Sequence, residues 1–374
     1  MGNLAGAGYC LFWGKIVFVK FLRSLFSFFG GKKKTAPGNY FISTATQSSD
    51  RVRRLGLSLP PDAGTAFLDL SRLSIPAAER QLPDEYKPDP YYEWVINVDP
   101  GGDRFFTIED VFGIFNLQWR QRFSDASVYG FSLTRNKWTY ALSDADGERF
   151  GRLQIGVSLL DIYDGDADGS SGAALLQNCF ESSEKMMRSY RNTGAAVQIT
   201  MTEPIDAAVA RSQQLLQLKK ELHHDMIVVL KSDNLYPGRL AWDVLSETGL
   251  RWGDGDLFHW NNSPRGYGDD RFFSVWTSTA PGYFFPEAIK AGTFNPVDLA
   301  FGFWIGRSAD PVGVYDVMVE VVAYCRQHLG GVMLGRDGQP FDAVAERTRL
   351  QQIVEEITLK GVQPGSNKAL RIFQ

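Results

Sequence analysis

Cysteine and histidine are scarce in this chain of 374 residues, and their spacing excludes several kinds of site. The three cysteines, Cys10, Cys179 and Cys325, are far apart and form neither a Cys-x-x-Cys pair nor a disulfide framework. Such usage fits a reducing compartment. The four histidines include no His-Glu-x-x-His arrangement, the zinc-binding pattern of metalloproteases. We therefore expect no metal and no cofactor.

An excess of positive charge is also missing. Lys and Arg number 39 against 43 Asp and Glu, which gives a formal net charge of −4. This balance does not build the broad basic surface of a nucleic-acid-binding protein. The segment Gly165–Gly172 lacks the Lys-Ser/Thr of a phosphate-binding loop, and no Ser, Cys or His arrangement suggests a nucleophilic triad. The sequence predicts neither an enzyme nor a nucleic-acid-binding protein.

One acidic segment imitates the first half of a calcium-binding loop. Asp164, Asp166 and Asp168 alternate with other residues and precede Gly169. An EF-hand loop needs a bidentate glutamate at its twelfth position, which here is Leu175. We interpret the segment as a solvated acidic loop.

The chain does contain an N-terminal hydrophobic stretch, Tyr9–Phe29, which as a helix could cross a hydrocarbon core about 30 Å thick. Lys15, Lys20 and Arg23 interrupt it, and Lys20 and Arg23 share one arc of the helix. This pattern also fits an amphipathic helix lying in the membrane interface. A signal peptide and a buried core helix are the alternatives, but no Ala-x-Ala cleavage site follows the stretch.

The run Lys32-Lys33-Lys34 follows directly and would lie on the cytoplasmic side of an anionic membrane. We predict that residues 1–34 associate with lipid at the cytoplasmic (inner) membrane, by spanning it or by lying on it. The globular part of the chain would then face the cytoplasm.

Residues 35–90 are rich in Pro, Ser and Arg, and predict a linker with some local docking. From there an order of strand, helix, strands, strand and helix occurs twice, over residues 91–222 and 223–360, before a tail at 361–374. The order predicts an α+β fold of two-layer sandwiches, each an antiparallel sheet with helices on one face. We expect two related domains in tandem, although unrelated two-layer sandwiches can produce the same order.

Individual elements follow from apolar runs, from the helix start at Thr107 with Asp110 three residues on, and from the helix stop at Gly249. In the first half we expect strands at Tyr92–Val98, Val128–Leu133, Lys137–Leu142, Gly151–Asp161 and Ala195–Thr202, and helices from Thr107, at Glu181–Arg191 and at Ile205–Leu222. In the second half we expect strands at His224–Lys231, Asp256–Asn261, Arg271–Ser278, Asp298–Ile305 and Val332–Gly335, and helices at Pro237–Thr248, Pro311–His328 and Asp342–Leu359.

Four segments of the second half have a more specific pattern. They are a glycine-bounded helix end with an apolar-Gly-Asp turn and an aromatic-His strand (residues 249–259), the strand Phe272–Val275, the segment Lys290–Pro296, and the Gly-Gly turn and strand Leu329–Leu334. In order and spacing these segments resemble the C-terminal FtsZ-binding domain of the bacterial ZipA family. The arrangement of membrane stretch, linker and C-terminal domain is similar too.

The resemblance implies an antiparallel sheet whose uncovered face carries a shallow apolar groove for the C-terminal tail of FtsZ. Carried over to this chain, the groove residues are Ile227 or Val228 with Val229, then Ala288, Lys290 and Phe303, and Trp276 with Trp304 and Phe301 refills it. The chain departs from the family at Gly255 and Ala288, where larger side chains are usual, and at Arg336, which alone remains of a basic cluster.

By this resemblance the protein is a membrane-associated cell-division adaptor that binds the FtsZ tail at the septum. The alternative is a ZipA-like scaffold that binds another protein, or itself, in an envelope-associated assembly.

Overall fold

The computed structural model describes residues 40–61, 67–77, 85–124, 126–142, 148–162, 170–189, 197–262 and 266–373. The hydrophobic stretch Tyr9–Phe29, the lysine run that follows it, and the acidic segment of Asp164, Asp166 and Asp168 lie outside these residues. In the described part of the chain, no helix is long and apolar enough to cross a membrane. The same residues contain no cluster of three His, Cys, Asp or Glu side chains that could hold a metal.

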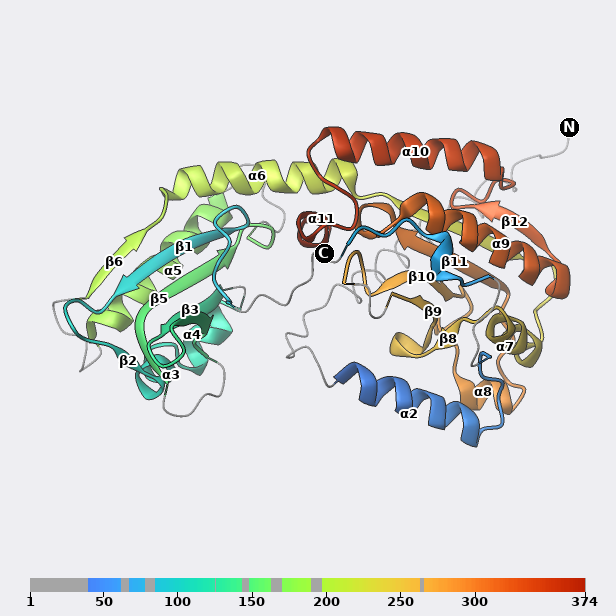
Figure 1. Cartoon of the computed structure of the whole chain (residues 1–374), viewed down its shortest axis with the longest axis horizontal. Coiled ribbons are helices and arrows are strands. Elements are labelled where there is room, and N and C mark those ends of the chain that lie inside the picture. Colours follow the sequence, from blue (N-terminus) through green and yellow to red (C-terminus); the bar gives the residue numbers. More distant parts are fainter. Residues whose placement is uncertain are drawn as a thin grey trace, which may run out of the picture. The chain divides into compact units, whose positions relative to one another are not determined.

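The described chain divides into two compact units (Figure 1). Residues 85–221 form one, which we call the middle unit. The described residues between 40 and 77 join residues 222–373 in the other, which we call the C-terminal unit.

The middle unit is an antiparallel sheet with four helices in its described part. Its strands are β1 (Glu93–Asp99), β2 (Phe106–Thr107), β3 (Ala126–Ser132), β4 (Lys137–Tyr140), β5 (Arg149–Ser158) and β6 (Gln198–Met201), in the order β4-β3-β5-β1-β6 with β2 on β5. Its helices are α3 (Ile108–Ile114), α4 (Leu117–Arg122), α5 (Ser170–Ser189) and α6 (Ile205–Leu222). The capping box predicted at the start of α3 is present, because the Thr107 side chain accepts from the Asp110 amide and Asp110 accepts from the Thr107 amide.

The helix predicted at Glu181–Arg191 is wrong in extent, because α5 begins at Ser170. Leu176, Cys179, Ser183 and Met187 are all fully buried and recur every three or four residues, which is the spacing of one helix face. The buried serine and the small residues near the start of α5 weakened that signal in the sequence.

The C-terminal unit has a six-stranded sheet in which every pairing is antiparallel. The strands are β7 (Asp225–Lys231), β8 (Arg251–Trp252), β9 (Phe258–Asn261), β10 (Arg271–Trp276), β11 (Asp298–Trp304) and β12 (Val332–Gly335), in the order β12-β7-β11-β10-β9-β8. The helices are α2 (Tyr40–Arg54), α7 (Gly238–Glu247), α8 (Pro286–Lys290), α9 (Pro311–Leu329), α10 (Ala343–Leu359) and α11 (Asn367–Ile372). The predicted α+β class with antiparallel sheets is therefore confirmed.

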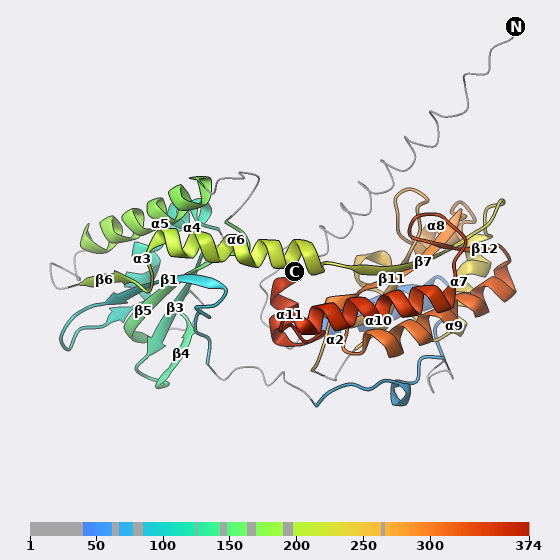
Figure 2. The ribbon, with the colours of Figure 1, turned by 90° about the horizontal axis from the view of Figure 1, so that it is seen from above.

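One face of this sheet is covered by helices. A row of residues on neighbouring strands lies on it: Gly335, Val228, Phe301, Val275, Phe258 and Trp252. Trp242 of α7 packs against Phe258 with ring centroids 4.8 Å apart and against Trp252 at 5.8 Å. Helix α9 contacts the sheet and α7, and α10 runs along α9 (Figure 2). This row and the helices form the main core.

The two sheets share part of their strand order. In each, the first strand lies between the last and the penultimate strand, as β6-β1-β5 in the middle unit and β12-β7-β11 in the C-terminal unit. Beyond these three strands the orders differ, since β5 is followed by the hairpin of β3 and β4 and β11 is followed by β10, β9 and β8. The relation between the units stays a prediction.

Residues 361–374, expected to be a tail, contribute a docked helix where the structure describes them. The Phe373 side chain is 1% exposed, and it packs on Gly306 so closely that a Cβ there would lie 2.5 Å from its ring. Arg307 donates to the carbonyl oxygens of Leu370 (3.4 Å) and Phe373 (3.2 Å), and a two-bond pair with Asp269 (2.7 and 3.0 Å) holds it in place. The end of the chain thus closes one end of the core.

Phe373→Ala is expected to lower the free energy of unfolding of the C-terminal unit by about 3–5 kcal/mol, because it leaves a cavity under α11. Urea unfolding of the full-length protein measures this. Leu359→Ala, whose side chain is 87% exposed, is the matched control and should change stability by less than about 0.5 kcal/mol. Equal, small changes in both variants would show that α11 is not part of the core.

Candidate peptide-binding face

Strand β7, which lies between β12 and β11, is apolar on both faces. Met226, Val228 and Leu230 are fully buried. They face the helices, because Val228 pairs with Phe301 in the row that the helices cover. Ile227 and Val229 point the other way, because successive side chains of a strand alternate, and they are 4% and 6% exposed. A strand of this composition needs a second layer of apolar contacts on the face away from the helices.

A row of four directly opposed side chains supplies this layer. It runs from Leu334 on β12 through Val229 on β7 and Ala300 on β11 to Trp276 on β10. These residues and their neighbours form what we call the apolar cluster: Ile227, Val229, Leu257, Trp276 and Ala300, with Tyr283 and Leu334 packed against them.

The indole of Trp276 lies across the backbone of β11 at Gly302. A Cβ at Gly302 would lie 2.8 Å from Trp276 Cη2 and 3.1 Å from Ile227 Cγ1. The Met226 carbonyl oxygen would also lie 2.8 Å from that Cβ, so movement of the ring alone would not admit another residue type, and Gly302 permits the close approach. Trp276 is only 4% exposed and is one of the buried residues of this face.

The rim of the face is more accessible than its centre. Val332, on the same face of β12, is 56% exposed, and Leu334, Tyr283 and Trp304 are half-buried. Lys231 follows the cluster along β7 and is exposed. The face thus offers a shallow apolar rim with a positive charge beside it.

A buried histidine on β9, His259, links strand β10 to the turn that contains Asp254. His259 Nε2 lies 2.7 Å from the carbonyl oxygen of Asp254, which can only accept, so Nε2 carries the hydrogen. Its Nδ1 therefore accepts from the Ser274 hydroxyl at 2.8 Å. Burial, reinforced by the charge of Arg271, lowers the pKa of His259 to about 3. The imidazole is a neutral structural link and not an acid–base group at neutral pH.

The structure brings together some of the sequence-predicted groove residues. Ile227, Val229 and Trp276 meet in the apolar cluster. Val228 and Phe303 do not join them, because Val228 pairs with Phe301 and Phe303 with Met226 on the helix-covered face. Strand alternation, which puts adjacent residues on opposite faces, is the physical reason.

The other two predicted groove residues lie on α8, where Ala288 is half-buried and Lys290 is exposed. Arg336, the remaining member of the basic cluster, forms an ion pair with Asp225. Gly255 has a φ of 68°, a backbone conformation that side chains other than glycine rarely adopt. A larger residue at that position would be strained, so the backbone explains this departure from the family pattern.

Four cluster members were not predicted from the sequence: Leu257, Tyr283, Ala300 and Leu334. Gly302, which contacts Trp276 from outside the cluster, was not predicted either. Alternation along β11 contains the signal for Ala300 and Gly302, since small residues at 300 and 302 alternate with large ones at 299, 301 and 303. Leu257 and Tyr283 lie outside the strands, where no periodicity marks them.

A sheet covered by helices on one face, with an apolar row on the other, is an arrangement that protein-binding α+β modules use. Residues 224–352 match the family model described as ZipA, C-terminal FtsZ-binding domain. The resemblance predicted from four sequence segments is therefore confirmed for this part of the chain.

Over residues 224–352 the match supports a ZipA-type domain of a cell-division protein, and the matched family consists of protein-binding adaptor domains and not of enzymes. The match does not extend to residues 91–222, so the second copy is not shown. No curated protein matches the chain.

The neutral, buried His259 makes stability depend on pH. In the unfolded chain an imidazole binds a proton below its ordinary pKa of 6.5, whereas the folded chain resists protonation down to about pH 3. The stabilisation is complete above pH 6.5 and is lost as the pH falls from there towards 3. We expect this group to lower the free energy of unfolding by about 2 kcal/mol between pH 7.5 and pH 5.

Urea unfolding at both pH values, for the natural protein and for His259→Gln, isolates this contribution. The variant should lose about 2 kcal/mol less than the natural protein over the same interval. Identical losses would mean that His259 is protonated in the folded state.

Proposed function

We propose that the C-terminal unit binds the C-terminal tail of FtsZ on the face that carries the apolar cluster. The family match over residues 224–352 is the observation that carries the proposal. The geometry supports it, because α7 and α9 occupy the opposite face and leave this one with an apolar rim. A peptide tail laid across such a rim gains affinity from a few apolar anchors.

The exposure of each side chain on this face indicates which residues a bound peptide would contact. Trp276, Val229 and Ala300 are buried and form the floor, whereas Val332, Leu334 and Tyr283 offer accessible apolar atoms to a peptide. Lys231 is exposed beside the cluster and adds positive charge for an acidic tail, whereas the exposed Lys290 ammonium lies on the strap side, 3.9 Å from where a Cβ of Gly56 would be.

A second candidate keeps the fold and changes the partner: a ZipA-like scaffold that binds another protein or itself. The filling of the face by Trp276 and the helix-side position of Phe303 favour it, since both alter the surface that a tail would contact.

We also propose that residues 1–34 hold the protein at the cytoplasmic membrane, with the two units in the cytoplasm. The length of Tyr9–Phe29 and the lysine run after it support this. Together, the two proposals describe an adaptor that links FtsZ to the membrane at the division septum.

Val332→Asp is expected to weaken binding of a synthetic FtsZ tail peptide at least about tenfold, because it puts a charge into an apolar contact worth about 1.4 kcal/mol. Fluorescence anisotropy with the full-length protein measures the affinity. Val344→Asp is the matched control, since Val344 is 77% exposed on α10, which packs on α9 on the helix side.

Loss of affinity in Val332→Asp alone supports the proposal. Equal effects of the two variants would move the site elsewhere, and failure of the natural protein to bind the peptide would favour the second candidate.

Replacing Lys32, Lys33 and Lys34 with glutamine should weaken binding to anionic vesicles by on the order of a hundredfold, because each of the three lysines near such a surface contributes about 1 kcal/mol. Co-sedimentation with vesicles measures the binding, and neutral vesicles are the control. An equal loss on both kinds of vesicle would exclude an electrostatic role for the run.

A further inference from the structure

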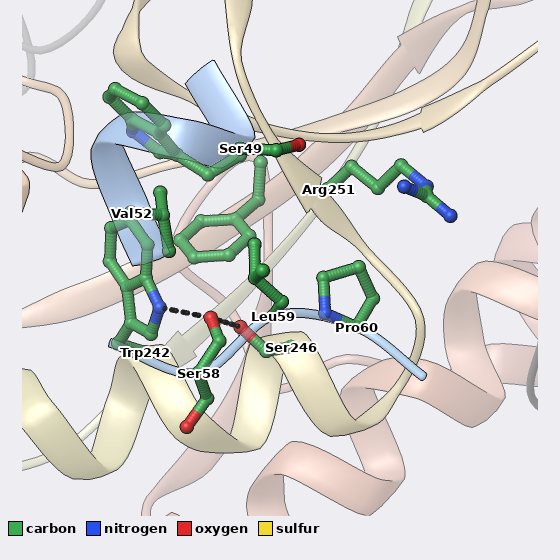
Figure 3. Close-up of a pocket in the computed structure, with 10 residues that line it drawn as sticks. Ser49, Val52, Ser58, Leu59, Pro60, Trp242, Ser246 and Arg251 are labelled. Atoms are coloured by element: carbon green, nitrogen blue, oxygen red, sulfur yellow. Dashed lines mark hydrogen bonds between the residues drawn. The ribbon is translucent and has the colours of Figure 1, made fainter. Parts of the chain in front are cut away.

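A segment of the expected linker is bound to the C-terminal unit like a ligand. This segment, residues 49–60, comprises the end of α2 and the extended chain after it, and we call it the strap. Val52 and Leu57 of the strap are 1% and 5% exposed. A small pocket where the strap meets the unit is lined on the unit's side by Trp242, Ser246, Arg251, Trp252 and Phe258 (Figure 3).

Side chains of helix α7 hold the strap mainly through the strap's backbone carbonyl groups. Trp242 Nε1 donates to the carbonyl oxygen of Ser58 at 2.9 Å, and the Ser246 hydroxyl donates to the same oxygen at 3.2 Å (Figure 3). Arg239 donates to the carbonyl oxygen of Gly56 at 2.8 Å. Convergent donors on alternate carbonyls are the way in which proteins hold an extended peptide.

Helix α7 also binds the side chain of Ser58 in the strap. The Ser58 hydroxyl donates to Oδ1 of Asp243 at 2.7 Å, and Asp243 lies on α7 beside the residues that hold the backbone. A negative charge at position 58 would therefore meet a carboxylate within hydrogen-bonding distance.

The other end of the strap is held by charge. Arg51 donates to both oxygens of Glu287 on α8, at 2.8 and 2.7 Å, and lies 3.6 Å from Asp256. Its guanidinium lies over the rings of Trp252 (5.2 Å) and Phe285 (5.8 Å). The Arg51 and Glu287 side chains are 34% and 48% exposed, so water and salt weaken this pair.

We propose that the strap is a displaceable intramolecular ligand, and that the cleft of α7, β8 and α8 is a second peptide-binding site, separate from the apolar cluster. Two deeply buried side chains and a few hydrogen bonds hold it in place. Ordering twelve residues (49–60) opposes them with a large loss of chain entropy, so docking and release are closely balanced.

Release of the strap changes how far the unit can lie from the N-terminal stretch. Twelve freed residues at about 3.3–3.6 Å each add at most roughly 40 Å of reach. This consequence rests on the proposed membrane association of residues 1–34. The docking itself does not, and it can be tested without membrane or FtsZ.

Limited trypsin digestion of the full-length protein tests the strap, since Arg53 and Arg54 are exposed at the end of α2. We expect Ser58→Asp to accelerate cleavage at these residues at least about tenfold, while cleavage after Arg326 in α9 stays slow. Asp243→Asn alone should leave the rate within about twofold of the natural protein. The double variant Ser58→Asp/Asp243→Asn should restore it, because an amide can donate to the new carboxylate.

Rescue by the double variant, with α9 protected throughout, supports the proposal. Cleavage at Arg54 that occurs only together with cleavage at Arg326 would show that strap and core unfold as one, and would overturn it. No acceleration in Ser58→Asp would also overturn it. Protection that grows with protein concentration would assign the docked strap to a second copy of the chain and contradict docking within one chain.

Discussion

The contact of the Trp276 indole with the backbone of Gly302 is the constraint on which the candidate site depends. It lies on a sheet in which β7, the strand next to β11, is apolar on both faces. Helices α7 and α9 bury one face, and without a large side chain across β11 the other face would expose Ile227 and Val229. The ring supplies this cover and leaves an apolar rim at β12 and Tyr283 for a partner. Fold stability and binding surface therefore depend on the same contact.

The segments at the two ends of the C-terminal unit extend it beyond the matched residues 224–352. Phe373 and α11 close one end of the core, and the strap covers the cleft beside α7. Residues 67–77 add a third contact, with the Phe67 ring 5.0 Å from that of Tyr324 and Arg72 paired with Glu320 at 2.6 Å. Two described parts of the expected linker, the strap and residues 67–77, therefore lie on the surface of the C-terminal unit.

Much of the fold could be predicted from the sequence because apolar patterning is strong in the strands. Each predicted strand occurs within three residues of its expected ends, as at Asp298–Ile305 against β11 at Asp298–Trp304. The short helices α8 and α11 could not be predicted, because tertiary contacts such as that of Phe373 with Gly306 stabilise them and local pattern does not.

The candidate site was predictable only in part. Resemblance indicated β7, α8 and β11, but it could not decide which face each residue takes, and a shift of one position moves a side chain across the sheet. Val228 and Phe303 fell on the helix side for this reason, whereas Ile227, Val229 and Trp276 came together. Arg51 and Ser58 of the strap carry no sequence signal, because their partners are more than 180 residues away.

The FtsZ tail is proposed to bind the face of the apolar cluster. Amide hydrogen exchange of the full-length protein, with and without the tail peptide, tests it most directly. Binding on this face slows exchange in β12 and around Tyr283, and leaves α9 and α10 unchanged. Protection confined to α7, α8 and the strap, or no protection anywhere, would contradict binding on the face of the apolar cluster.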